Sequence, residues 1–183
     1  LFRLLLGLVV LVAALALVAA TVGPLLVDPA PAPGETRVQA PERPGSRFVE
    51  IPYPGSDGLR LHLAERPTAT DAAGDVGDAP TFVLLHGFTF NLYTWERILA
   101  PLAGRGRVIA YDQIPYGLSA KPLPGTRESG DPYAKAAALS QLLTLLDDLG
   151  VEQAYLVGNS SGGTLALEAA LAYPERVRGL ILL

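Results

Sequence analysis

The segment "YLVGNSSGGTL", Tyr155 to Leu165, carries the pattern that decides the fold. An apolar run ends at Val157, a short stretch of glycine, asparagine and serine follows, and a helix-like segment then begins. Gly158 and Gly162 stand two residues before and two residues after Ser160, which fits the G-x-S-x-G pattern of a turn between a strand and a helix. The pattern predicts a sharp, strained turn that lifts the Ser160 hydroxyl out of a sheet.

The spacing of the glycines selects Ser160 over its neighbour Ser161. In so tight a turn the residues two before and two after the exposed serine crowd each other, so both must lack a bulky side chain. A turn centred on Ser161 would place Asn159 at one of these positions, where its side chain does not fit. Ser160 is therefore the predicted nucleophile. The helix that follows directs its N-terminal amides at this serine, and the Ser161 backbone N–H is a predicted oxyanion-hole donor.

From residue 47 onward the sequence alternates predicted strands with predicted helices. The strands are predicted at 47–52, 59–66, 81–87, 107–112, 154–159 and 178–183, and helices at 91–104 and 131–150; a third helix is predicted to follow the serine turn and to end at Pro174. The apolar run at 81–87 is continuous, as expected of a strand buried on both faces of a parallel sheet. The order predicts an α/β domain, a mostly parallel sheet with flanking helices and right-handed crossovers.

The chain has only two histidines, His62 and His86, and both lie far upstream of Ser160. In the strand predicted at 59–66, leucines alternate with Arg60 and His62, which is typical of a half-exposed strand. We therefore expect His62 to be a solvated surface residue. Asp112, at the end of a predicted strand, is expected to cap a turn, with a role as charge partner as the alternative.

Bulk composition indicates a membrane segment in addition to the domain. Half of the residues are hydrophobic and only 17% are charged, and mean hydropathy is +0.33. No charge lies between Arg3 and Asp28, and as a helix the 24 residues from Leu4 to Val27 would extend about 36 Å. We expect residues 1–27 to form a transmembrane anchor, which this length favours over a signal peptide cleaved near residues 18–20.

The predicted anchor also implies where the domain is located relative to the membrane. Arg3 is the only cation near the apolar run, so the positive-inside tendency predicts a single-pass membrane protein whose domain is extracytoplasmic. Residues 28–46 contain five prolines in 19 residues and are expected to form an extended tether between anchor and domain. A net charge of −4 without a basic cluster disfavours nucleic acid as a partner, and the absence of cysteine excludes disulfides and cysteine metal ligands.

The residues from Phe48 to Leu183 resemble the N-terminal part of the α/β-hydrolase family. The resemblance rests on three motifs: "LLHGFTFNLYTW" is similar to the family's HG loop, "GNSSGG" to its nucleophile turn, and "YDQIPYGLSAKP" to its D-x-x-G-x-G-x-S segment. In the last motif Pro115 replaces the first glycine, whereas Gly117 and Ser119 are kept. The domain is thus expected over residues 47–183.

The resemblance implies roles for further residues. Phe88, which follows the HG pair, would supply the second oxyanion-hole amide, and its side chain would line the pocket. His86 would shape that loop rather than act as the base. Tyr93 and Trp95 are expected to pack internally, although Tyr93 is also a candidate for the substrate pocket. Because epoxide hydrolases and haloalkane dehalogenases of this fold use aspartate as nucleophile, a serine at position 160 disfavours those reactions.

These observations predict a serine hydrolase acting on an ester or related acyl substrate, with no metal or organic cofactor. The alternatives are a C–C bond hydrolase, a cofactor-free perhydrolase, or a non-catalytic binding relative. The resemblance places the base and its acid in later strands, so we expect the 183 residues to be a fragment that is inactive alone.

Overall fold

The computed structural model describes residues 2–26, 45–53, 58–68, 79–122 and 131–183. The chain divides into two compact units, Leu1–Ala40 and Pro41–Leu183. Most of the predicted tether at 28–46 lies outside the described residues; Ser46, its last residue, already belongs to the first strand of the second unit.

The first unit contains one helix, α1 (Phe2–Leu26), of 25 residues. Crossing a bilayer requires about 20 consecutive apolar residues. Among the residues that the structure describes, no helix combines the length and the apolar character that such a crossing needs. This finding contradicts the predicted transmembrane anchor at residues 1–27, and with it the single-pass membrane location, the extracytoplasmic domain and the membrane as a partner.

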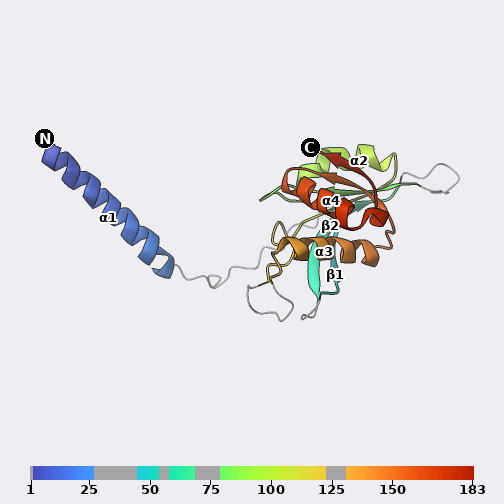
Figure 1. Cartoon of the computed structure of the whole chain (residues 1–183), viewed down its shortest axis with the longest axis horizontal. Coiled ribbons are helices and arrows are strands. Elements are labelled where there is room, and N and C mark those ends of the chain that lie inside the picture. The colour runs from blue at the N-terminus through green and yellow to red at the C-terminus, as the bar shows by residue number, and fades with distance from the viewer. Residues whose placement is uncertain (1, 27–44, 54–57, 69–78, 123–130) are drawn as a thin grey trace. The chain divides into compact units, whose positions relative to one another are not determined.

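The second unit is built on a six-stranded sheet in the order β1-β2-β4-β3-β5-β6 (Figure 1). The strands are β1 (Ser46–Ile51), β2 (Leu59–Arg66), β3 (Thr81–Leu85), β4 (Arg107–Tyr111), β5 (Ala154–Gly158) and β6 (Val177–Leu182). β2 pairs antiparallel with β1 and with β4, whereas the pairs β3–β4, β3–β5 and β5–β6 are parallel. The predicted α/β class with a mostly parallel sheet is confirmed.

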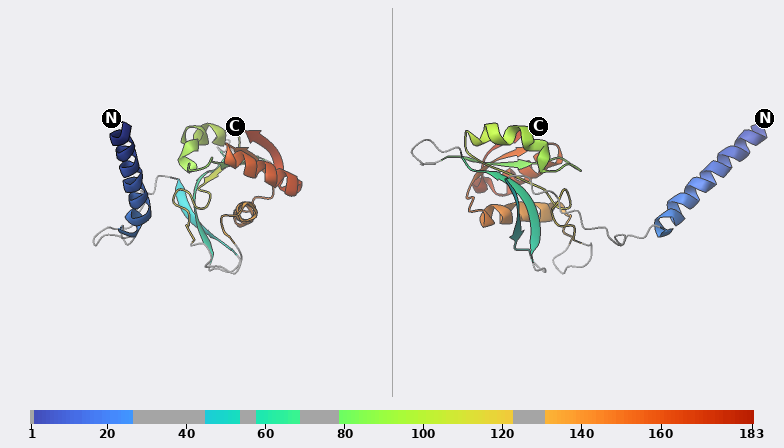
Figure 2. Two further views of the ribbon diagram at one scale, coloured as in Figure 1. Left: turned by 60° about the vertical axis from the view of Figure 1, so that its left-hand side comes forward. Right: turned by 180° about the vertical axis from the view of Figure 1, so that it is seen from behind.

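Helices cover both faces of this sheet, as Figures 1 and 2 show. A 3₁₀ turn, η1 (Leu92–Trp95), leads into α2 (Glu96–Ala103) on one face, where the side chains of η1 and α2 share a core with Leu84 and Val108. On the other face α3 (Lys135–Asp148) and α4 (Ser161–Ala172) share a core with Leu85 and Ile109. A second 3₁₀ turn, η2 (Pro174–Arg176), joins α4 to β6. Burial on both faces explains the continuous apolar runs of the central strands.

The prediction that His62 is a solvated surface residue is wrong. Arg60 is exposed as the alternation predicts, but His62 is only 2% exposed. The His62 ring lies 5.0 Å from the Phe48 ring on β1 and 6.0 Å from the Tyr93 ring on η1, measured between centroids. The polar face of β2 is thus covered by residues distant in sequence, which the period of a single strand cannot reveal.

An ion-pair network ties the antiparallel strands together. Glu65 on β2 accepts hydrogen bonds from Arg47 on β1, at 2.9 Å, and from Arg107 on β4, at 2.7 Å. Burial alone would raise the pKa of Glu65, but the two hydrogen bonds and the charges of the arginines outweigh it and lower the pKa below its ordinary value of 4.5. The pairs are partly exposed, so solvent weakens their contribution to stability.

Replacing Glu65 should therefore have a pH-dependent effect on stability. Because the folded-state pKa is lowered, the stabilisation is complete above the unfolded-state pKa and is lost as pH falls through the folded-state pKa. We expect Glu65→Gln to lower the free energy of unfolding by about 0.5–1 kcal/mol at neutral pH, and the two proteins to converge in acid. Urea unfolding at both pH values measures this. Glu168→Gln, which removes an exposed pair with Lys135, is the control and should change little; an equal loss at both pH values for Glu65→Gln would contradict the assignment.

Candidate active site

Ser160 lies in the turn between β5 and α4, and its side chain is exposed. Its backbone angles are φ 52° and ψ −118°, a region that residues with a side chain rarely adopt. Such a conformation costs about 1–3 kcal/mol and persists only where the surroundings enforce it. The turn has neither relaxed into the helix nor buried the serine.

Two glycines enforce the turn by close backbone contacts. A Cβ at Gly158 would lie 2.5 Å from the carbonyl oxygen of Gly162 and from the Cα of Gly163. A Cβ at Gly162 would collide with the carbonyl oxygen of Leu85 and would lie 2.6 Å from that of His86. The crowding predicted between the two glycine positions exists at Gly158, whereas Gly162 is pressed against the end of β3.

The structure brings the HG loop against this turn. A Cβ at Gly87 would lie 3.4 Å from the Cβ of Ser160 and 2.9 Å from Oδ1 of Asn159. Ser161 is the first residue of α4, and Phe88 follows Gly87 directly. Among the described residues, the backbone N–H groups of Phe88 and Ser161 find no acceptor within the protein. Both predicted oxyanion-hole amides are therefore unpaired, and Gly87 and Ser161 place them next to Ser160.

His86 is fully buried, and both of its ring nitrogens are occupied. The Gln113 backbone N–H donates to Nε2 at 2.9 Å, so the proton lies on Nδ1, which donates to the Gly87 carbonyl oxygen at 2.8 Å. Burial lowers the pKa of His86 below its ordinary value of 6.5 and outweighs the opposing influence of Gly87 and Asp112. This neutral imidazole is not positioned to take a proton from Ser160, which agrees with a loop-shaping role.

Asp112 caps the turns that follow β3 and β4, as expected, and its carboxylate also forms a buried hydrogen bond with the His62 ring. Its buried carboxylate accepts the Leu92 N–H on Oδ1 at 2.7 Å, and the Leu118 N–H and the His62 Nδ1–H on Oδ2, each at 2.8 Å. The Ser119 hydroxyl donates to the Asp112 carbonyl oxygen at 2.6 Å and accepts the His62 N–H at 2.9 Å. The Nδ1 of His62 and both carboxylate oxygens of Asp112 are therefore engaged in hydrogen bonds within the protein.

The predicted aromatic residues take different positions, and two others that the sequence did not assign, Phe90 and Tyr116, lie at the HG loop. Tyr93 is half-buried beside the His62 ring, and Trp95 is buried in the α2 core. Phe88 and Phe90 are 67% and 56% exposed, and the Tyr116 ring stands edge-on to that of Phe88. Cδ2 of Phe90 would lie 3.4 Å from a Cβ at Gly87, the same distance as Ser160. An apolar surface therefore borders Ser160; the sequence signal for Phe90 was a second phenylalanine, two residues after Phe88.

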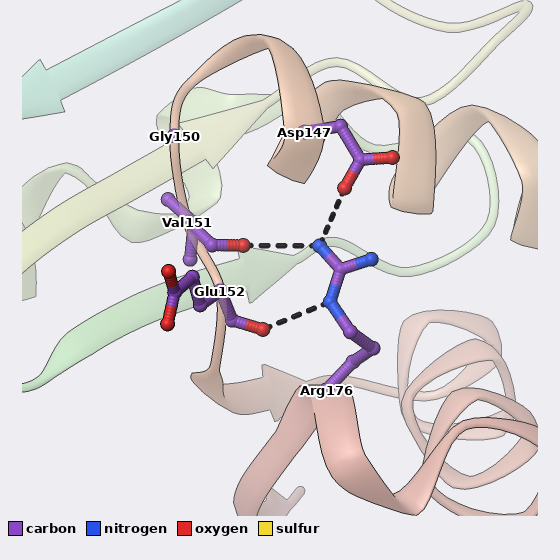
Figure 3. Close-up of a pocket in the computed structure, with 5 residues that line it drawn as sticks. All are labelled: Asp147, Gly150, Val151, Glu152 and Arg176. Atoms are coloured by element: carbon purple, nitrogen blue, oxygen red, sulfur yellow. Dashed lines mark hydrogen bonds and ion pairs between the residues drawn. The ribbon is translucent and has the colours of Figure 1, made fainter.

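A separate hollow of about 400 Å³ lies at the other end of β5, lined by Asp147, Gly150, Val151, Glu152 and Arg176 (Figure 3). The Arg176 guanidinium donates to the Asp147 carboxylate at 2.7 Å and to the carbonyl oxygens of Val151 at 3.0 Å and Glu152 at 2.8 Å. These bonds join α3, the segment that leads into β5, and η2. The hollow is a structural junction, remote from Ser160 at the carboxyl end of β5.

The family model described as alpha/beta hydrolase fold matches residues 80–183, more than half of the chain. The chain belongs to the alpha/beta hydrolase fold family. This confirms the resemblance read from the three motifs.

Relatives of this α/β hydrolase are named for several different activities. It is 35% identical over 151 residues to bifunctional epoxide hydrolase 2 of Mus musculus, covering 74% of this chain and 24% of that protein. It is 36% identical over 107 residues to fluoroacetate dehalogenase of Burkholderia sp, covering 58% of this chain and 34% of that protein. The chain thus spans a quarter to a third of the length of these relatives.

Solved structures of α/β hydrolases superpose on the same region. Epoxide hydrolase VrEH1 from Vigna radiata matches with a TM-score of 0.60 at 26% identity, over 75% of this chain and 37% of that one. Est816, described as an N-acyl homoserine lactone degrading enzyme, matches with a TM-score of 0.58 at 28% identity, over 74% of this chain and 44% of that one.

The glycine contacts predict a graded mutational series. Gly158→Ala and Gly162→Ala should each lower the free energy of unfolding by about 1–3 kcal/mol, because a methyl group has no room against backbone atoms. Gly163→Ala is the comparison: its Cβ would meet the Gly158 carbonyl oxygen at 3.3 Å, a tight contact without overlap, and alanine suits a helix, so a smaller effect is expected. Chemical denaturation measures the series, and three equal effects would refute the steric argument.

Proposed function

We propose that the protein is a serine hydrolase that acts on a carboxylic ester or related acyl substrate. The observation that carries this proposal is the exposed Ser160 in a strained turn, bordered by the amides of Phe88 and Ser161, which have no acceptor among the described residues. A positioned nucleophile beside two backbone donors is the arrangement that acyl transfer requires.

The proposed reaction proceeds in two steps. The Ser160 oxygen attacks the carbonyl carbon and loses its proton to a base, while the Phe88 and Ser161 N–H groups stabilise the oxyanion. The intermediate collapses, and the alcohol leaves with the proton that the base returns. Water then attacks the acyl-enzyme in the same way, releasing the acid and restoring Ser160.

The base of this mechanism is not one of the two histidines of the chain. His86 is held on both ring nitrogens, and His62 is 2% exposed and bonded to Asp112. We propose that the base and its orienting acid belong to a longer protein and follow residue 183, as the family resemblance implies.

The identity of the nucleophile favours acyl substrates over epoxides and alkyl halides. A carboxylate that attacks an epoxide carbon forms an ester, and water can cleave that ester at its carbonyl carbon. A serine that attacks the same carbon forms an ether, which has no carbonyl for water to attack. We therefore do not extend the activities named for the epoxide hydrolase and dehalogenase relatives to this protein. A lactone, the substrate named for Est816, is a cyclic ester and fits the proposed acyl chemistry.

Covalent labelling of the full-length protein tests the proposal. A fluorophosphonate probe should label the wild type and Ser161→Ala, because the latter keeps its backbone N–H, and Ser160→Ala should not be labelled. Hydrolysis of a p-nitrophenyl ester should follow the same order, with a loss of at least about 10³-fold in Ser160→Ala, while styrene oxide should not be turned over. A folded wild type that resists the probe and hydrolyses no ester would be a binding relative rather than an enzyme.

A further inference from the structure

We propose that Gln113 is a positioning residue for the oxyanion-hole loop, defined as residues 86–92. The inference rests on the proposed function, because it concerns how the Phe88 amide is held beside Ser160. Gln113 itself lies outside the catalytic chemistry and acts through His86.

Gln113 forms two hydrogen bonds with His86, the first residue of this loop. Its backbone N–H donates to His86 Nε2 at 2.9 Å, and its side-chain Nε2 donates to the His86 carbonyl oxygen at 2.7 Å. His86 is thereby held at its ring and at its backbone by one residue. The His86 ring in turn holds the next residue of the loop, because its Nδ1–H donates to the carbonyl oxygen of Gly87, next to Phe88.

The adjacent residue Asp112 holds the other end of the loop. Its Oδ1 accepts the backbone N–H of Leu92, where η1 begins, and its carboxylate is fixed by His62. The arrangement follows from the sheet: β3 and β4 pair in parallel with Leu85 opposite Tyr111, so the chain leaves both strands at the same edge. Two consecutive residues after β4 therefore anchor both ends of the loop that follows β3.

The loop between these anchors is strained. Thr89 has a φ of 62°, a left-handed conformation that is unusual for a β-branched residue, and the Phe90 N–H closes a turn on the Gly87 carbonyl oxygen at 3.2 Å. Strain of this kind persists only where neighbouring contacts over-determine the backbone. An oxyanion donor must lie about 2.7–3.1 Å from the developing charge, so even a small relaxation of the loop would weaken it.

The side-chain amide of Gln113 can be removed while an unbranched side chain of similar length is kept. Gln113→Met keeps the size of the side chain and its backbone N–H, but it loses the donor to the His86 carbonyl oxygen. The matched control is Gln141→Met on α3, which loses a comparable bond from a buried side-chain amide to the Pro132 carbonyl oxygen at 3.0 Å. Both variants lose one amide-to-carbonyl bond, and only one of these bonds touches the loop.

The experiment compares both variants with the full-length wild type. The measurements are kcat and KM for a p-nitrophenyl ester, the inhibition constant of a trifluoromethyl ketone, which forms a tetrahedral oxyanion, and urea unfolding. We expect Gln113→Met to lower kcat about 10- to 100-fold and to weaken ketone inhibition by a similar factor, with KM changed less than about twofold. Gln141→Met should lose stability alone.

The possible results separate the two proposals. If Gln113→Met keeps the wild-type kcat and ketone affinity and only loses stability, as Gln141→Met does, the positioning role is refuted and the proposed function stands. If the wild type hydrolyses no ester and ignores the ketone, the proposed function fails and this inference fails with it.

Discussion

The close approach of Gly162 to the carbonyl oxygens of Leu85 and His86 determines how the rest of the site is built. It presses the first turn of α4 against the end of β3, a contact that only a residue without Cβ allows. The same contact sets the Ser160 turn beside the loop that follows His86. A strained conformation at Ser160 is maintained because the backbone on both sides of it has no freedom to relax.

The buried polar residues at this edge of the sheet serve that arrangement. His62, His86 and Asp112 lie inside the domain, where an unpaired polar group would be costly, and each is bonded to another of them or to the loops around them. Because the two imidazole rings and the Asp112 carboxylate are hydrogen-bonded to one another or to the loops, they are not positioned to exchange protons with Ser160. The described part of the chain therefore holds the proposed nucleophile and the proposed oxyanion donors between loops that are fixed by buried hydrogen bonds.

Features set by local sequence could be predicted, whereas contacts across the sheet could not. The β2 bounds and the glycine turn followed from periodicity and motif, since each depends on neighbours in sequence. The prediction for His62 is wrong because Phe48 and Tyr93 lie against its ring, and the role of Gln113 was not predicted because its partner His86 follows a different strand. The apolar run of α1 predicted a helix correctly, but the further step to a membrane span was contradicted.

Membership of this family does not determine which reaction a protein catalyses, and the residue at position 160 reduces the set of reactions to be considered. An oxyanion hole is needed wherever a nucleophile attacks a carbonyl carbon. With a carboxylate nucleophile, that carbonyl belongs to the enzyme and appears only in the second step, when water cleaves the enzyme ester. With Ser160 it must belong to the substrate, in both steps. The same loop can therefore support either chemistry, so similarity to proteins named for epoxide hydrolysis is compatible with the acyl substrate proposed for this chain.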